Sequence, residues 1–123
     1  MEKPGGILPT PEELQLIKEF LILPIILSVF VRDQKIISAA VKTPEPYNQN
    51  IQQAMDRIVK DLAGIKSEFR RRGIRVFDEK CDQNGARCKY LCRGYQSEFP
   101  LLHSFLRAEV AQRMSRYLGG QNG

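Results

Sequence analysis

The stretch EKCDQNGARCKYLCRGY (residues 79–95) decides whether this 123-residue chain is a plain helical bundle or a mixed α+β fold. Asn84-Gly85 at its centre is the strongest two-residue signal for a β-hairpin, because a type I′ turn needs positive φ at both central positions. With that turn, Cys81 faces Cys88 across the two strands. One face of the predicted hairpin then carries Phe77, Cys81, Cys88, Tyr90 and Cys92.

The three cysteines on this face allow three interpretations. Cysteine usually packs as a small buried hydrophobe, and we favour that interpretation. A zinc site with His103 as fourth ligand is the alternative, although the spacing lacks the paired C-x2-C knuckles of structural zinc sites. A Cys81–Cys88 disulfide would have suitable geometry, with Cα atoms about 5.5 Å apart. The odd cysteine count and the lack of a signal peptide predict a reducing cytoplasm instead, which disfavours the disulfide.

Upstream of the hairpin, the sequence has the clearest helical period in the chain. Apolar residues recur at alternating spacings of four and three, which is typical of a helix packed along a heptad seam. They are Ile51, Met55, Ile58, Leu62, Ile65 and Phe69. We expect this seam to mediate self-association. Gly73 ends the helix directly after three arginines, whose charge suits a helix C-terminus.

A first helix is expected to begin at Thr10, which can form a capping box with Glu13, and to run to about Ala40. It is apolar on nearly every side, so it must be covered on every side. Pro24 should kink or break it. The continuous apolar run, residues 20–31, is shorter than the roughly 20 residues needed to cross a bilayer. We therefore expect a buried helix and no membrane contact.

The third helix is expected to begin at a Ser97 cap, with Pro100 in its first turn, and to stop at Gly119-Gly120. Its predicted inner stripe is Leu102, Phe105, Leu106, Val110, Met114 and Tyr117. The predicted fold is therefore α+β and mostly helical, with three long helices (the first kinked at Pro24) and one β-hairpin between helices 2 and 3. We expect one domain over residues 10–119, a flexible arm over 1–9 and a flexible tail over 120–123.

The positive charge is concentrated in one region. Residues 66–93 hold nine Lys or Arg against four Asp or Glu, which accounts for the whole net charge of +5. A basic hairpin after a helix suggests a winged-helix layout that touches phosphates, although the preceding helix is long for a recognition helix. The candidate anion or nucleic-acid surface is Arg70, Arg71, Arg72, Arg75, Lys80, Arg87, Lys89 and Arg93.

Nothing in the sequence predicts an enzyme. The chain has no nucleophile elbow, phosphate-binding glycine loop, dinucleotide fingerprint or zinc-protease helix. Its single histidine, His103, lies among apolar residues, where a structural role is commoner than a catalytic one. We expect no cofactor, no bound metal and no small-molecule substrate.

Three stretches, FLILPIILSVFVRD (20–33), KTPEPY (42–47) and KYLCRGY (89–95), resemble the YhjD-like proteins, an uncharacterised family of small proteins from Bacillus-type bacteria. The resemblance implies a bacterial cytoplasmic protein and brings no activity or catalytic residue with it. The resemblance gives no support to a metal role for the cysteines.

Two functions are expected from these features. The apolar first helix and the heptad seam present more apolar surface than a chain of this size easily covers. The leading hypothesis is therefore a non-enzymatic regulatory or adaptor protein that forms a homodimer and contacts an unknown protein partner. The alternative is a DNA- or RNA-binding protein that uses the basic surface of residues 66–93.

Overall fold

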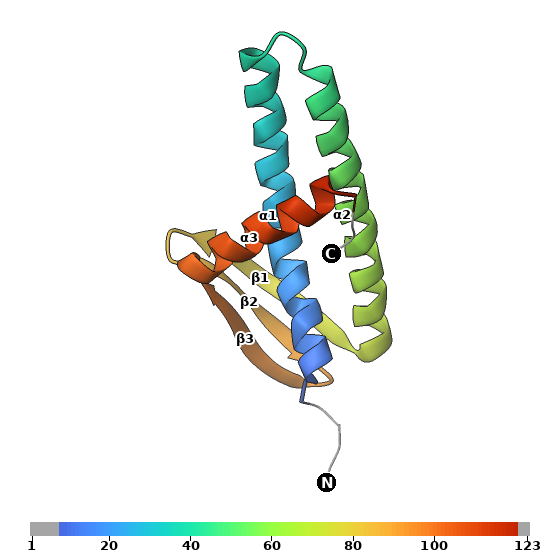
Figure 1. Ribbon diagram of the computed structural model, residues 1–123. Helices are drawn as coiled ribbons and strands as arrows, with labels where there is room; N and C mark the ends of the chain where they lie inside the picture. The colour runs from blue at the N-terminus through green and yellow to red at the C-terminus, as the bar shows by residue number, and fades with distance from the viewer. Residues whose placement is uncertain (1–7, 121–123) are drawn as a thin grey trace.

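Residues 8–120 are described by a computed structural model with three helices and one antiparallel sheet (Figure 1). The order is α1 (Pro11–Ala40), α2 (Glu45–Arg72), β1 (Ile74–Asp82), β2 (Gly85–Cys92), β3 (Tyr95–Leu102) and α3 (His103–Leu118), and the strands lie in the order β1-β2-β3. The mostly helical α+β class is confirmed. Most of the predicted arm and tail lies outside the described residues.

The sheet, α2 and α3 together cover α1. Figure 1 shows α1 running across one face of the sheet, with α2 beside it and α3 crossing over both helices. This arrangement buries the first two-thirds of α1 on several sides at once, so the all-round apolar pattern has a physical reason. The buried apolar residues are Ile17, Leu21, Ile22, Leu23, Ile26 and Phe30. The capping box of Thr10 and Glu13 is present, and the helix ends at Ala40, as predicted.

Pro24 does not break α1, which continues as one helix from Pro11 to Ala40. The ring lies on an exposed side of the helix. The carbonyl that Pro24 cannot bond is therefore near water, which lowers the cost of the missing hydrogen bond.

The heptad seam of α2 packs within the chain. Ile51, Ile58, Ile65 and Phe69 are buried, while Met55 and Leu62 are partly buried against the same core. The Phe69 ring meets the Phe20 ring of α1 edge-on, with centroids 5.2 Å apart. The period was predicted correctly, but the partner that fills the seam belongs to the same chain. Gly73, with φ 70°, terminates α2 as expected.

The prediction of a single hairpin is wrong, because β3 replaces the expected start of the last helix. In β3, Tyr95, Ser97, Phe99 and Leu101 alternate toward the core side, and Ser97 pairs with Tyr90 instead of capping a helix. The strand lies at the edge of the sheet. Proline is tolerated there because backbone N–H groups on the outer side of an edge strand form no hydrogen bonds within the sheet. Pro100 therefore sits in a strand, and α3 begins at His103.

The predicted type I′ turn at Asn84-Gly85 is also wrong. Asp82 pairs with Gly85, so the turn residues are Gln83 and Asn84, and the Asn84 N–H donates to Asp82 Oδ1 at 2.8 Å. Gly85 belongs to β2, where its φ is 136° and an added Cβ would lie 1.9 Å from the Leu101 carbonyl oxygen. The glycine is needed for this close approach of backbones rather than for the turn itself.

The register changes as a consequence. Cys81 pairs with Ala86 instead of Cys88, and a bulge between Phe77 and Lys80 shifts the pairing by one further residue along β1. Asp78 occupies that bulge with φ 56°. A shift of one residue exchanges the two faces of a strand, so beyond the bulge Ile74 and Val76 pack against the core in place of the predicted Phe77. Cys88, Tyr90 and Cys92 are buried, whereas Cys81 is exposed.

The third helix buries only part of its predicted stripe. Leu106 and Tyr117 are buried, and Val110 and Met114 are partly buried against the core. Leu102 and Phe105 are exposed. Arg113 is buried in their place, at 3% exposure. The helix ends at Leu118 with Gly119 as its cap, close to the expected stop.

Among the described residues, α1 is long and apolar enough to cross a membrane by length and composition. A core helix passes the same test, and the buried residues of α1 here form much of the core. The expectation of no membrane contact stays a prediction.

Candidate functional site

The predicted basic surface divides into cations with different surroundings. Five of the eight have a carboxylate partner: Arg71, Arg72, Lys80, Lys89 and Arg93. Arg70, Arg75 and Arg87 are exposed and form no ion pair with any residue from 8 to 120. The charge concentration seen in the sequence is therefore neutralised at several of its positions.

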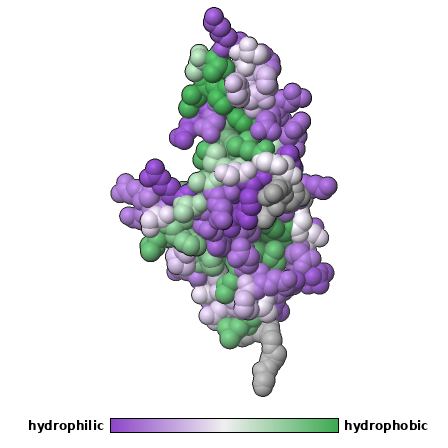
Figure 2. Space-filling view, viewed as in Figure 1, coloured by the Kyte–Doolittle hydropathy of each residue, from purple (hydrophilic) through white to green (hydrophobic). Residues whose placement is uncertain are grey.

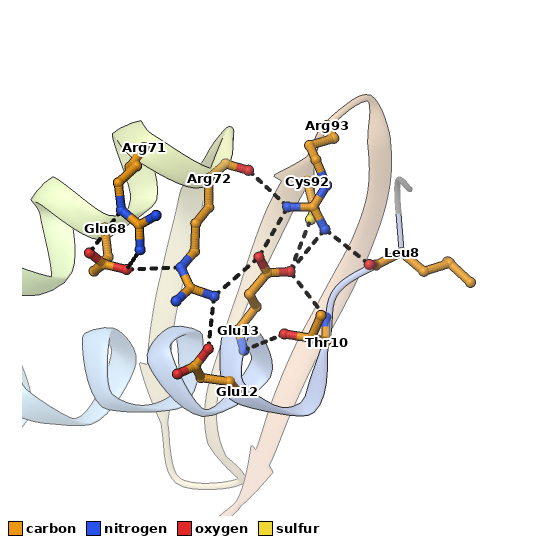
Figure 3. A network of polar contacts seen from close by, with 9 residues as sticks. All are labelled: Leu8, Thr10, Glu12, Glu13, Glu68, Arg71, Arg72, Cys92 and Arg93. Atoms are coloured by element: carbon orange, nitrogen blue, oxygen red, sulfur yellow. Dashed lines mark hydrogen bonds and ion pairs between the residues drawn. The ribbon is translucent and has the colours of Figure 1, made fainter. Parts of the chain in front are cut away.

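Figure 3 shows Glu13 at the centre of a polar cluster that joins segments far apart in the sequence. Arg93, between β2 and β3, donates from Nη1 to Glu13 Oε2 at 3.1 Å and from Nη2 to Glu13 Oε1 at 2.9 Å. The Thr10 N–H donates to Oε1 at 3.1 Å, and Arg72 at the end of α2 reaches Oε2 at 3.5 Å. The paired contacts from one guanidinium are the strong, two-pronged kind that arginine makes with carboxylates. We call these four residues the Glu13 cluster.

The Glu13 cluster keeps a buried carboxylate ionised. The hydrogen bond from Arg93 is the main cause that holds the pKa of Glu13 at about 2, helped by the Thr10 N–H and by Arg72. Burial acts in the opposite direction and raises this pKa, because the charged form loses its water. At neutral pH Glu13 is thus a fixed anion that pins the start of α1, and it is unsuited to proton transfer.

Arg93 also shapes the turn that carries it. Its φ is 48° and that of Gly94 is 94°, so both central residues have the positive values of a type I′ turn. The Arg93 guanidinium donates to the Arg72 carbonyl at 2.8 Å and to the Leu8 carbonyl at 3.0 Å. These bonds offset the strain of positive φ at a residue other than glycine. The I′ turn expected at Asn84-Gly85 therefore occurs one hairpin later.

Carboxylates outside the Glu13 cluster neutralise more of the basic segment. Arg72 also contacts Glu12 at 3.0 Å and Glu68 at 2.9 Å, and Arg71 contacts Glu68 at 2.6 Å. On the outer face of the sheet, Asp78 lies 3.5 Å from the Lys89 amine. Most of these groups are solvent-exposed, so each pair adds little stability, but together they reduce the local positive potential.

The cysteines do not converge on a metal site in the described part of the chain. No group of three or more His, Cys, Asp or Glu side chains there could hold a metal ion. All three thiols are free, and burial raises the pKa of Cys88 to about 11. His103 is exposed at the start of α3.

A second polar cluster joins α3 to α1 around the buried Arg113. Its guanidinium donates to both carboxylate oxygens of Glu19 and, at 2.9 Å, to Glu109. Lys18 contacts Glu109 at 2.8 Å, and its hydrogen bond is the main cause that lowers the pKa of Glu109. Burying a cation is costly, and two carboxylates compensate for it here. Sequence reasoning missed this cluster because Arg113 falls inside an apolar stripe.

Next to this cluster, an open cleft of about 720 Å³ lies between the three helices. Leu16 and Leu23 of α1 and Gly64 and Ile65 of α2 provide apolar lining, while Lys60 and Arg116 contribute positive charge. Tyr117 at its side donates to Asp61 Oδ2 at 2.6 Å. We call this space the helix cleft.

A family model described as YhjD protein matches residues 8–122. The chain belongs to the YhjD family. The resemblance seen in the sequence is thereby confirmed. Uncharacterized protein YhjD of Bacillus subtilis (strain 168) is 27% identical over 104 residues, covering 84% of this chain and 87% of that relative. No solved structure matches the chain. These relatives support a bacterial origin, and their names state no activity.

The far end of α1 carries apolar residues that this family member leaves uncovered. Figure 1 shows α1 and α2 extending together beyond α3 and the sheet, and Figure 2 shows hydrophobic residues gathered over this end. Ile25, Val29, Ile36 and Ala40 are spaced by four, seven and four residues, which places them on one helix face. We call them the α1 outer stripe. Ile36 is 56% exposed.

The six residues predicted to mediate self-association lie elsewhere. They are buried or partly buried on the inner face of α2, so they are not available to a second chain without opening the core. The exposed apolar surface at this end comes from α1 and the start of α2, where Val31, Val41 and Tyr47 are also exposed. A pairing surface is therefore better sought on α1.

Proposed function

We propose that the chain is a non-enzymatic adaptor or regulatory protein that self-associates through the α1 outer stripe. The observation that carries the proposal is the exposure of Ile36, together with the half-buried Ile25 and Val29 on the same face. The stripe covers about 22 Å of helix at 1.5 Å per residue. Burying each large aliphatic side chain contributes roughly 1.5–3 kcal/mol, which favours pairing.

A two-fold dimer suits this surface, since both copies then present the same patch to each other. The C-terminal part of the outer stripe, with Ile36 and Ala40, lies at the end of α1 that extends beyond the sheet and α3, where a second helix can approach (Figure 1). Ile25, at the other end of the stripe, lies beside Glu79 and Cys81 of β1. The buried residues of α1, such as Ile26 and Phe30, already belong to one core with those of α2, so pairing would extend an existing helix layer without rearranging the core.

The surroundings of the ionisable groups support a role in contacts rather than catalysis. Glu13 is held ionised by Arg93, and Arg113 is held by Glu19 and Glu109. Each group has a structural partner that connects two elements of the fold. Catalytic acids and bases instead need a pKa near the working pH and access to a substrate.

Light scattering at increasing concentration tests the dimer. The wild type is expected at twice the chain mass of 14.1 kDa. Ile36→Glu places a charge in the outer stripe and should give a monomer with an unchanged circular dichroism spectrum. Lys35→Glu, on the neighbouring exposed position but outside the stripe, is the matched control and should remain a dimer. A wild type that stays at the chain mass at several hundred micromolar would overturn the proposal.

Nucleic-acid binding stays a second prediction, favoured by the exposure of Arg70, Arg75 and Arg87. These three arginines should be changed to Ala together, because Arg72 and Arg93 also hold the fold. Mobility shifts at two salt concentrations then read out phosphate contacts. Absence of binding at low salt removes this alternative.

A further inference from the structure

We infer that the helix cleft binds a small amphipathic anion, with an apolar body along α1 and α2 and a carboxylate at Arg116. This inference is independent of the proposed self-association, because the cleft and the α1 outer stripe share no residue. It adds a ligand where the sequence predicted no small-molecule substrate.

The size and lining of the helix cleft suit a small molecule. Its volume of about 720 Å³ lies within the usual range of ligand pockets, roughly 300–1,000 Å³. Such pockets are mainly apolar with a few polar groups that orient the ligand. Leu16, Leu23 and Ile65 supply the apolar part here.

Gly64 keeps the cleft open at a cost to α2. Glycine inside a helix destabilises it by about 1 kcal/mol relative to alanine. The backbone at Gly64 is helical, and apart from the adjacent residues and the backbone of α2 itself, no atom of residues 8–120 lies within 4 Å of the place where its Cβ would be. Neither backbone conformation nor packing inside the chain therefore requires glycine at this position. A bound molecule that comes close to the α2 backbone at Gly64 would explain why this position has no side chain.

The charges of the helix cleft favour an anion. The carboxylates of Glu19 and Glu68 are already paired with arginines, and Asp61 accepts from the Tyr117 hydroxyl. The cations Lys60 and Arg116, in contrast, form no ion pair within residues 8–120.

Arg116 also has an unmet hydrogen-bonding group. Its Nε is buried and has no hydrogen-bond partner among residues 8–120. A buried donor without an acceptor is costly, and a ligand carboxylate would supply one. An arginine fork matches a carboxylate better than it matches a neutral head group.

Calorimetric titration of the full chain with laurate, kept below its micelle concentration, tests the inference. Dodecanol is the matched neutral probe, since it has the same apolar chain without the charge. Saturable binding of laurate, at least tenfold tighter than dodecanol, is expected. Arg116→Gln should remove that tenfold preference, whereas Arg107→Gln, an exposed arginine of α3 outside the cleft, should keep it.

Gly64→Leu provides the test of location. Leucine is a strong helix former and there is open space at its Cβ, so the variant should fold at least as well as the wild type. Its side chain fills the cleft and should weaken laurate at least tenfold. Unchanged laurate affinity in Gly64→Leu would overturn the inference. So would loss of binding in Ile36→Glu alone, which would place laurate on the α1 outer stripe.

Discussion

Replacing Glu13 by Gln removes the negative charge of this side chain but keeps an oxygen that can accept the capping hydrogen bond. The amide oxygen of Gln can still accept from the Thr10 N–H, so the capping box is largely retained. The charge that Arg93 and Arg72 surround is lost, and the amide N–H₂ group meets their donors instead. The stability of the chain should therefore fall for an electrostatic reason.

The magnitude follows from the pKa of Glu13. A fall from 4.5 to about 2 corresponds to about 3 kcal/mol of stabilisation at neutral pH, at about 1.4 kcal/mol for each pKa unit. Glu13 is 4% exposed, so solvent screens little of this energy. Glu13→Gln is therefore expected to lower the free energy of unfolding by about 3 kcal/mol at pH 7.

The pH dependence has a definite sign. Because the pKa of Glu13 is lower in the folded state, its contribution is present above the unfolded value of 4.5 and is lost as the pH falls toward about 2. The gap between wild type and Glu13→Gln should thus be largest at neutral pH and close between about pH 5 and pH 2.

Urea unfolding followed by circular dichroism, repeated across this pH range, measures the gap. Glu12→Gln is the matched control, since Glu12 lies in the same helical turn but its side chain is 72% exposed and, within residues 8–120, forms an ion pair only with Arg72. The control should cost less than about 1 kcal/mol. Equal losses for the two variants, or a gap that does not narrow in acid, would refute the role assigned to the Glu13 cluster.

Three further predictions concern the sheet, the third helix and the thiols. Gly85→Ala should destabilise by at least about 2 kcal/mol in urea, because its Cβ would meet the Leu101 carbonyl at 1.9 Å, whereas Gly94→Asn, at φ 94° in open space, should cost less than about 1 kcal/mol. Tyr117→Phe removes the 2.6 Å bond to Asp61 and should cost about 1–2 kcal/mol in the same assay; a neutral effect would contradict that bond. In the folded protein a thiol reagent should label Cys81 rapidly and Cys88 only after unfolding, since burial raises the pKa of Cys88 to about 11. Rapid labelling of a second thiol would contradict the burial of Cys88 and Cys92.

Local signals in the sequence were enough for the start of α1, the end of α2 and the α2 seam. Thr10 and Glu13 predict the start of α1, and Gly73 predicts the end of α2, because caps depend on a few neighbouring residues. The seam that begins at Ile51 follows from helix geometry alone. These features required no knowledge of what lies across the core.

Competing local signals explain the missed strand. Asn84-Gly85 indicates a hairpin turn more strongly than Arg93-Gly94 does, and Ser97 with Pro100 resembles a helix start. The structure makes its I′ turn at Arg93-Gly94 and pairs Ser97 with Tyr90. The choice depends on backbone pairing across strands and on the close approach at Gly85, neither of which a short window of sequence contains.

The sequence by itself determined that this chain belongs to a mostly helical α+β class, where α1 begins and α2 ends, and that its positive charge is concentrated between residues 66 and 93. Only the tertiary structure decided what those charges do. Arg93 meets Glu13 across 80 residues of chain, and Arg72 meets it across 59. A cation stays a solvated surface charge unless the fold brings a carboxylate against it, in which case the pair connects two elements of the fold. The distance between cation and carboxylate is set only when the chain folds.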